Sequence, residues 1–235
     1  MNKELIVVCN GGSLRNFDFK SIDRDKYSIL ITGKAFRYFR KNHIDYDYYC
    51  CIDDAVSKSC EWEICREIKQ KNIKCLLTVT AGWSVETIKI FHKNNHKIGF
   101  LEDLKKKENN AFSQLEDKYT TGSSAILFGM FLEYKKINIL GLDNDYVNTA
   151  NWRIRPDEKR EIFKDLVGNP NYFFDNYERT GDVKNAPNNI ENIHTDSIIK
   201  AIDIADVNNI ELINYNNKKS FSDNIKTLSL NKFDN

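Results

Sequence analysis

The chain has 235 residues, of which 41% are hydrophobic, so it is long enough for one large domain with a full core. Its 35 Lys and Arg residues nearly balance its 34 Asp and Glu residues, which excludes a global field that would favour nucleic acid or an anionic membrane. Local basic patches stay compatible with this balance. No apolar run approaches the roughly 20 residues of a transmembrane helix. The first four residues lead straight into a strand-like run, so we expect no signal peptide and a cytoplasmic protein.

Strand-like and helix-like segments alternate along the chain. Continuous apolar, β-branched runs predict buried strands at 5–9, 27–32, 47–52, 74–79, 97–100, 136–143 and 210–215. Helical patterns lie at 35–39, 60–69, 85–92, 121–133 and 196–205, and residues 102–118 form a helix or a surface excursion. The alternation predicts a Rossmann-like α/β fold, with a doubly wound, mostly parallel sheet and helices on both faces.

One domain is expected over residues 1–217. It includes a long polar segment at 168–193, rich in Asn and Asp, which reads as a loop. A polar tail follows at 218–235 and is expected to fray. The six cysteines show no zinc spacing and come in a chain without an export signal, so we expect reduced, buried thiols and no metal site.

The loop after the first strand reads Asn10-Gly11-Gly12-Ser13. Glycines let the backbone approach a ligand, and free amides at a helix start favour a phosphate. The loop matches neither the dinucleotide fingerprint nor a Walker loop, which disfavours a Rossmann NAD site and a P-loop kinase. A tight turn with Ser13 as N-cap explains the same residues equally well.

A second loop of small residues, Thr120-Thr121-Gly122-Ser123, opens a helix and can hold a carboxylate or phosphate, or simply cap that helix. Gly141 and Asp143 end a buried strand. The Asp143 carboxylate can bind a ribose hydroxyl or a base amine, or cap the next segment.

Three further groups can carry chemistry, each with a plain structural alternative. His194, just after the long polar loop, can serve as a general base or be structural. Arg153 and Arg155 beside an aromatic ring can clamp a phosphate or carboxylate, or form a solvated face. Asp53, at a strand end, can bind a metal through water or cap the next helix.

These signals occur together in an order that resembles the bacterial sialyltransferases of glycosyltransferase family 42. The first loop resembles that family's N-G-P-S-L opening. Residues 120–123, a helix and the strand 136–143 resemble its T-S-G loop, helix and strand ending in G-I-D. His194, followed by residues 196–201, resembles the catalytic histidine before a D-I-K-A helix. The segment 168–193 has the place of that family's mobile lid.

The sequence departs from the family pattern at several positions. Gly12 replaces a proline, Gly33 replaces the Asn after the second strand, and Asp53 falls near the Asn after the third. Lys118 stands for an arginine before the T-S-G loop. The family holds the donor phosphate with two tyrosines. Here Tyr146 lies nearby, and Arg153 or Arg155 takes the second place.

A second group is also similar: the motility-associated flagellin glycosyltransferases and an archaeal pterin pyrophosphokinase. The resemblance lies in residues 35–53, which lead into a strand ending at Asp53. His194 favours the sialyltransferases, and Asp53 favours this other group. The second resemblance implies a nucleotide-dependent transferase or pyrophosphokinase that uses Mg²⁺. A non-catalytic module that binds nucleotide sugars is the third alternative.

The sialyltransferase resemblance implies transfer of a nonulosonic acid, such as a sialic acid, from a CMP-linked donor to a sugar hydroxyl on a surface glycan. Lipooligosaccharide or capsule synthesis in a bacterium would be its setting. The implied catalytic residues are His194 as general base, Tyr146 and Arg153. The implied donor-binding residues are Asn10, Gly11, Gly12, Ser13, Gly33, Asp53, Lys118, Thr120, Thr121, Gly122, Ser123, Gly141, Asp143 and Arg155. No cofactor is required, the partners are the donor and the glycan acceptor, and no nucleic acid is expected. A peripheral contact with the inner membrane face and a homo-oligomer are compatible with this interpretation.

Overall fold

The structure is a computed structural model. It describes residues 3–70, 73–79, 83–93, 97–107, 111–114, 119–143, 153–154, 162–164, 173, 178–180, 186–216 and 222–233. Side chains are described for most of these residues, but not for residues 55, 70, 92 and 97, the short strands between 153 and 180, or 186–193.

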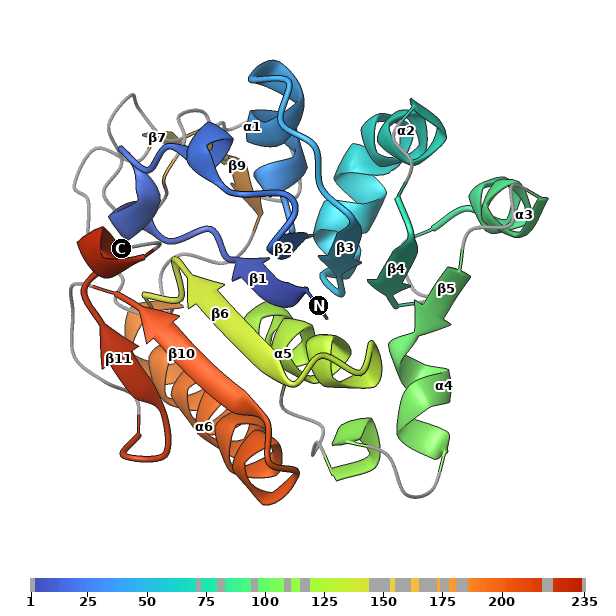
Figure 1. Cartoon of the computed structure of the whole chain (residues 1–235). Helices are drawn as coiled ribbons and strands as arrows, with labels where there is room; N and C mark the ends of the chain where they lie inside the picture. Colours follow the sequence, from blue (N-terminus) through green and yellow to red (C-terminus); the bar gives the residue numbers. More distant parts are fainter. Residues whose placement is uncertain are drawn as a thin grey trace.

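An eight-stranded sheet forms the centre of the molecule (Figure 1). Its strands are β1 (Glu4–Val8), β2 (Tyr27–Thr32), β3 (Tyr48–Cys51), β4 (Cys75–Thr78), β5 (Lys97–Phe100), β6 (Lys136–Leu140), β10 (Glu211–Tyr215) and β11 (Lys226–Leu228). The spatial order is β11-β10-β6-β1-β2-β3-β4-β5, and every neighbouring pair is parallel.

Helices cover both faces of this sheet. They are α1 (Ala35–Lys41), α2 (Asp54–Gln70), α3 (Val85–Lys93), α4 (Leu101–Lys106), α5 (Thr121–Phe131) and α6 (Ala186–Val207). The first three pack on one face and the last three on the other (Figure 1). The predicted doubly wound, parallel α/β fold is therefore confirmed.

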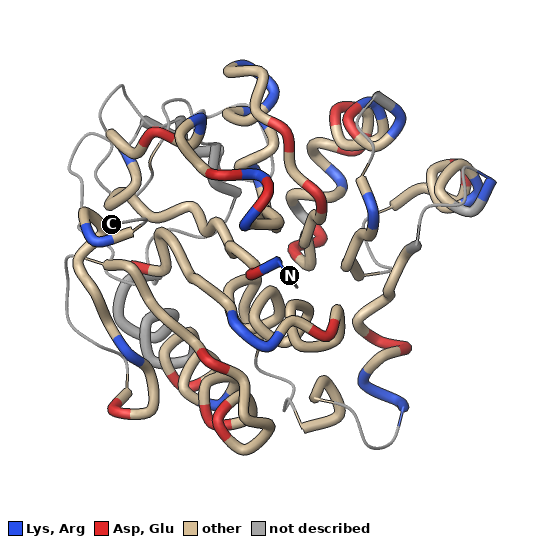
Figure 2. The backbone as a smooth tube through the Cα atoms, in the orientation of Figure 1, with Lys and Arg blue, Asp and Glu red and all other residues tan. Residues whose placement is uncertain are grey.

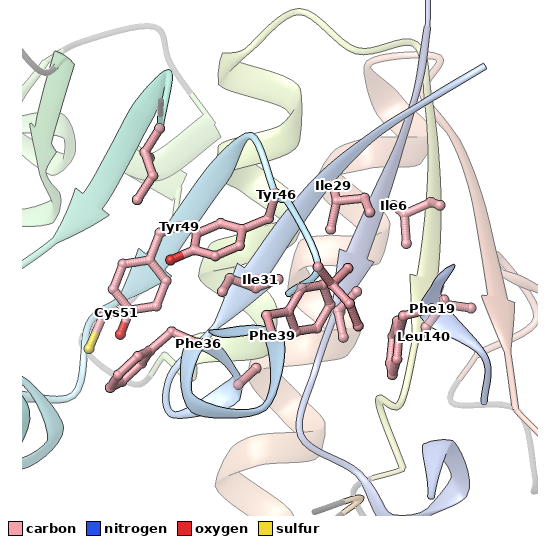
Figure 3. Packing of buried hydrophobic residues seen from close by; sticks show 14 of the residues in the cluster. Ile6, Phe19, Ile29, Ile31, Phe36, Phe39, Tyr46, Tyr49, Cys51 and Leu140 are labelled. Carbon is pink, nitrogen blue, oxygen red and sulfur yellow. The ribbon is translucent and has the colours of Figure 1, made fainter. Parts of the chain in front are cut away.

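The pleat of the strands explains the two cores. Successive side chains of a strand point to opposite faces, so Ile6 joins one apolar cluster and Leu5 the other. Figure 3 shows the first cluster, in which Phe36 and Phe39 of α1 pack against Ile31 of β2. Because both faces are covered, the central strands are continuous apolar runs.

Two helices begin earlier than the sequence indicates. α2 starts at Asp54 and α6 at Ala186, so the second half of the expected loop 168–193 is partly helical. Pro187 is compatible with this start because the first turn of a helix has no intrahelical amide bond to lose. Most of 168–185 lies outside the described residues. Within it, Phe173 is buried and its ring packs against Tyr38 and Phe19.

A second, antiparallel sheet was not expected from the sequence. It consists of β7 (Arg153–Ile154), β8 (Ile162–Lys164) and β9 (Glu178–Thr180), in the order β7-β8-β9. β9 also falls inside the segment expected to be a loop. Its strands have only two or three residues each, which is too short for an apolar pattern to reveal.

The expected polar tail is part of the sheet. β11 pairs with β10, and a short 3₁₀ turn at Leu230–Lys232 follows. The ring of Phe233 is buried against Tyr27 and Tyr215. The domain therefore extends past residue 217 to at least Phe233.

The cysteines agree with the sequence-based expectation. All six cysteines are free and buried, as predicted. Among the residues that the structure describes, no helix combines the length and the apolar character needed to cross a membrane.

Candidate functional site

The strand order changes direction at β1. From β1 the chain moves outward through β2 to β5, whereas β6 lies on the other side of β1. In doubly wound sheets, ligands bind outside the carboxyl ends of the strands at such a switch point. The loops that follow β1 and β6 meet there, and the sequence predicted both as ligand-binding loops.

A carboxylate joins these two loops. The backbone N–H of Ser13 donates to Asp143 Oδ2 at 2.8 Å, and the Ser13 hydroxyl donates to Asp143 Oδ1 at 2.6 Å. The N–H of Gly11 also donates to the carbonyl of Gly141 at 2.9 Å. Asp143 therefore holds the first loop, and its carboxylate oxygens retain lone pairs for a further donor.

The glycine at position 11 is required by this close approach. A Cβ there would lie 2.4 Å from the Gly141 carbonyl oxygen and 2.5 Å from Asp143 Cγ. Gly141 itself has a φ of +70°, which side chains rarely adopt. The two loops thus pack backbone against backbone.

Asn10 faces the end of the neighbouring strand. Its Nδ2 lies 3.4 Å from both the carbonyl and the hydroxyl oxygen of Thr32, close to Gly33, whose φ is +50°. Its Oδ1 is buried and has no hydrogen-bond partner among the described residues. An unpaired buried oxygen beside a glycine loop is available to a donor group on a ligand.

The second small-residue loop is a helix cap. The Thr120 hydroxyl accepts from the N–H of Ser123 at 3.1 Å, and the Ser123 hydroxyl accepts from the N–H of Thr120 at 2.9 Å. This capping box starts α5. The loop therefore caps the helix, as one of its two predicted roles requires. The free amides of the first turn are also compatible with binding an anion.

Ser197 connects this loop to His194. Its hydroxyl lies 3.2 Å from the Ser123 hydroxyl and donates to the His194 carbonyl at 3.2 Å. His194 lies inside α6 and is partly exposed, rather than preceding a helix as expected. Gly122 packs on Leu142 so closely that a Cβ at position 122 would lie 2.7 Å from Leu142 Cδ1. The loop after β6, the Thr120–Ser123 loop and the backbone of His194 are thereby linked at the carboxyl ends of the strands.

Asp53 has the capping role that was the alternative for its position. Its Oδ1 accepts from the N–H of Val56 at 3.2 Å, and its carbonyl accepts from the N–H of Ser57, so it caps α2. Within the described ranges, no group of three or more His, Cys, Asp or Glu residues could hold a metal ion.

Several expected residues lie outside the described residues: Lys118, Tyr146 and Arg155. Of Arg153 only the backbone in β7 is described. Their proposed roles in binding the donor phosphate stay predictions.

Two residues near the candidate site were not predicted from the sequence. Lys34 follows Gly33 directly, after the carboxyl end of β2, and is only 3% exposed. Its place after a strand end was the available signal. Ser197 gave no signal, because its link to Ser123 spans 74 residues of sequence.

At the end of β1, burial and then the nearby Asp143 charge raise the pKa of the Cys9 thiol to about 12, so the thiol stays protonated and unreactive at neutral pH.

The chain is a doubly wound α/β protein whose candidate ligand site lies where the loops after β1 and β6 meet. No protein-family model and no curated protein matches the sequence.

Solved structures do match. The sialyltransferase CstII from Campylobacter jejuni, in complex with the substrate analogue CMP-3FNeuAc, has a TM-score of 0.56 and 12% identity over 96% of this chain and 86% of its own. CstII with cytidine 5′-monophosphate gives 0.55 and 15% over 96% and 84%. The monofunctional α-2,3-sialyltransferase Cst-I of the same organism gives 0.55 and 15% over 95% and 79%. The chain therefore has the fold of these sialyltransferases.

Proposed function

We propose that the chain is a glycosyltransferase that moves a sialic acid-like nonulosonic acid from a CMP-activated donor to a sugar hydroxyl on a surface glycan. The observation that carries this proposal is the joining of the β1 and β6 loops by Ser13 and Asp143 at the switch point. Support comes from the shared fold with CstII, which has been solved in complex with CMP and with a CMP-linked substrate analogue.

The first loop would hold the nucleotide. Asn10 to Ser13 would lie against the phosphate and ribose, with the unpaired Asn10 Oδ1 accepting from a ribose hydroxyl. Asp143 would play two parts. Its carboxylate keeps the loop closed through Ser13, and its remaining lone pairs would accept from a ribose hydroxyl or a base amine.

The second loop and α6 would hold the reacting groups. Thr121 and the first amides of α5 would face the sugar or carboxylate of the donor. His194 would take the proton from the acceptor hydroxyl as that oxygen attacks the anomeric carbon, a contribution of about 10²–10⁴-fold. The Ser197 hydroxyl contacts both the His194 carbonyl and the Ser123 hydroxyl, so the helical turn that carries the imidazole is connected to the Thr120–Ser123 loop.

The leaving CMP needs positive charge or hydrogen bonds rather than a specific cofactor. Tyr146 with Arg153 or Arg155 would supply them, with Lys118 and Gly33 beside the donor. The segment 168–193 would close over the donor and exclude water, which would otherwise hydrolyse it.

Calorimetric titration of the full chain with CMP, with and without EDTA, tests the proposal. CMP should bind in both conditions, and CMP-sialic acid with a glycan acceptor should release CMP. Binding of ATP with Mg²⁺ or of a pterin, with no binding of CMP, would favour the pyrophosphokinase-like group. CMP binding without any turnover would leave a nucleotide-sugar binding module.

A further inference from the structure

A tryptophan lies at the centre of the exposed face of α2. Trp62 is 85% exposed, the most exposed of the large apolar side chains among the described residues. Lys58 and Arg66 lie four residues before and after it, and Lys69 lies seven after it, so all three share its face of the helix. All three are exposed, and none forms a salt bridge within the described part of the chain.

Three of the four acidic residues of α2 are used against other elements. Glu63 pairs with Arg37 and Arg40 of α1, and Glu67 is buried beside Arg40. The Glu61 carboxylate accepts from the N–H of Ser84 and is thereby used against α3. The fourth, Asp54, is exposed in the first turn, four residues before Lys58. Around Trp62 itself, the outward face of α2 carries the cations Lys58, Arg66 and Lys69.

The neighbouring helix extends this surface. The bond between Glu61 and Ser84 brings the start of α3 beside the middle of α2. Val85 of α3 is 62% exposed, and Lys89 and Lys93 follow it at helical spacing, with Glu86 as the one acidic residue among them. Figure 2 shows α2 and α3 beside each other, with Lys and Arg segments on both helices and Asp and Glu segments on α2 as well. We call Lys58, Trp62, Arg66, Lys69, Val85, Lys89 and Lys93 the α2–α3 face.

We propose that the α2–α3 face docks on the surface of an anionic phospholipid membrane. The whole chain has a net charge of only +1, so the five cations around the two exposed apolar side chains are a local concentration of positive charge. Trp prefers the membrane–water interface, and Lys and Arg near it are attracted by anionic headgroups. A protein partner fits less well, because the cores of protein interfaces are depleted in Lys. This inference does not depend on the transferase proposal, because the face lies on elements that do not form the candidate site.

Co-sedimentation of the full chain with vesicles tests the docking. Vesicles of phosphatidylcholine with phosphatidylglycerol should bind the protein, vesicles of phosphatidylcholine alone should not, and added salt should weaken the binding. Trp62→Ala should lower the vesicle partition coefficient by about tenfold. Lys58→Glu with Arg66→Glu should lower it by about 25-fold or more, since each cation near the surface accounts for about fivefold.

Matched variants elsewhere provide the controls. Val207→Ala removes another exposed apolar side chain, and Lys226→Glu reverses a charge on β11, at the other edge of the sheet. Both should bind vesicles like the wild type. Absence of binding to phosphatidylglycerol vesicles, or equal losses in the control variants, would overturn the proposal. A dimer that Trp62→Ala dissociates, without vesicle binding, would assign the face to a second copy of the chain instead.

Discussion

At the scale of single residues, the contact between the β1 and β6 loops is the feature on which the site depends. Ser13 donates twice to Asp143, and Gly11 brings its backbone against Gly141. These bonds fix the amides that would face a phosphate. A substitution that separates the loops should therefore affect nucleotide binding before it affects the rest of the fold.

Gly11→Ala tests this directly. Its Cβ would overlap the Gly141 carbonyl oxygen and the Asp143 carboxylate, neither of which can move without opening the loop. We expect CMP affinity to fall by about tenfold or more, roughly the energy of one charge-assisted hydrogen bond, as measured by calorimetry. Gly99→Ala on β5 is the control, because its Cβ meets only flexible leucine side chains and a more distant carbonyl. Equal CMP affinity in Gly11→Ala and wild type would contradict the placement of the nucleotide.

The residue types of the site were predictable from the sequence, but their partners were not. Asn10 to Ser13 and Asp143 were selected because small and polar residues follow buried strands. The bond between Ser13 and Asp143 spans 130 residues, and no local pattern carries that information. The capping role of Asp53 was one of two alternatives, and the contact with Val56 shows that role in the structure.

At the scale of elements, the start of α5 rests on Thr120. Its hydroxyl caps the helix by accepting from the N–H of Ser123. Thr120→Ala should lower the free energy of unfolding by about 1 kcal/mol, within the range known for N-caps, in urea denaturation. Thr121→Ala, one residue into the helix, should change it by less than half as much. Equal effects at the two positions would mean that the capping box does not stabilise the helix.

Asp47 lies just before β3, away from the candidate site, and connects that strand to β2 and to the start of β4. It accepts from the N–H of Ile29 and pairs with Arg24 and Lys74. Burial alone would raise the pKa of Asp47, but these hydrogen bonds and charges outweigh burial and lower it below its usual value. A lowered folded-state pKa means that the stabilisation is complete above the unfolded pKa of about 3.9 and is lost as pH falls through the folded pKa.

Asp47→Asn should therefore make the free energy of unfolding less dependent on pH in the acid range. Urea unfolding between about pH 6 and pH 3 should show a smaller loss of unfolding free energy in the variant than in the wild type. Asp25→Asn, at an exposed residue just before β2, serves as the control and should leave the slope unchanged. Parallel slopes for wild type and Asp47→Asn would show that Asp47 does not contribute to acid sensitivity.

The central strands were predictable because burial on both faces makes them continuous apolar runs. β2 and β5 were predicted with the bounds observed in the structure. The early start of α6 was missed because Pro187 and the Asn residues after it are typical of a loop, although the first helical turn tolerates both. β11 was missed because three residues at a sheet edge carry no usable apolar pattern.

At the scale of the whole molecule, ligand binding should stabilise the fold, because the site joins the two halves of the sheet. CMP at 100 times its Kd should add about 2.7 kcal/mol of stability, seen as a rise in Tm. ATP and GTP should give smaller shifts, since the first loop lacks a Walker lysine. EDTA should not remove the CMP effect. A large shift with ATP and Mg²⁺, and none with CMP, would exclude the CMP site.

CMP release in the presence of a glycan acceptor shows whether the chain transfers a sialic acid-like sugar with His194 as general base. The wild type should release CMP from CMP-sialic acid in the presence of a glycan acceptor. His194→Ala should lower kcat by about 10²-fold or more with nearly unchanged CMP affinity. His43→Asn, at a residue with a φ of 56° that Asn tolerates, should keep full activity. No CMP release by the wild type would exclude the transfer. A His194→Ala variant within about threefold of wild type, short of the general-base range, would exclude His194 as the base.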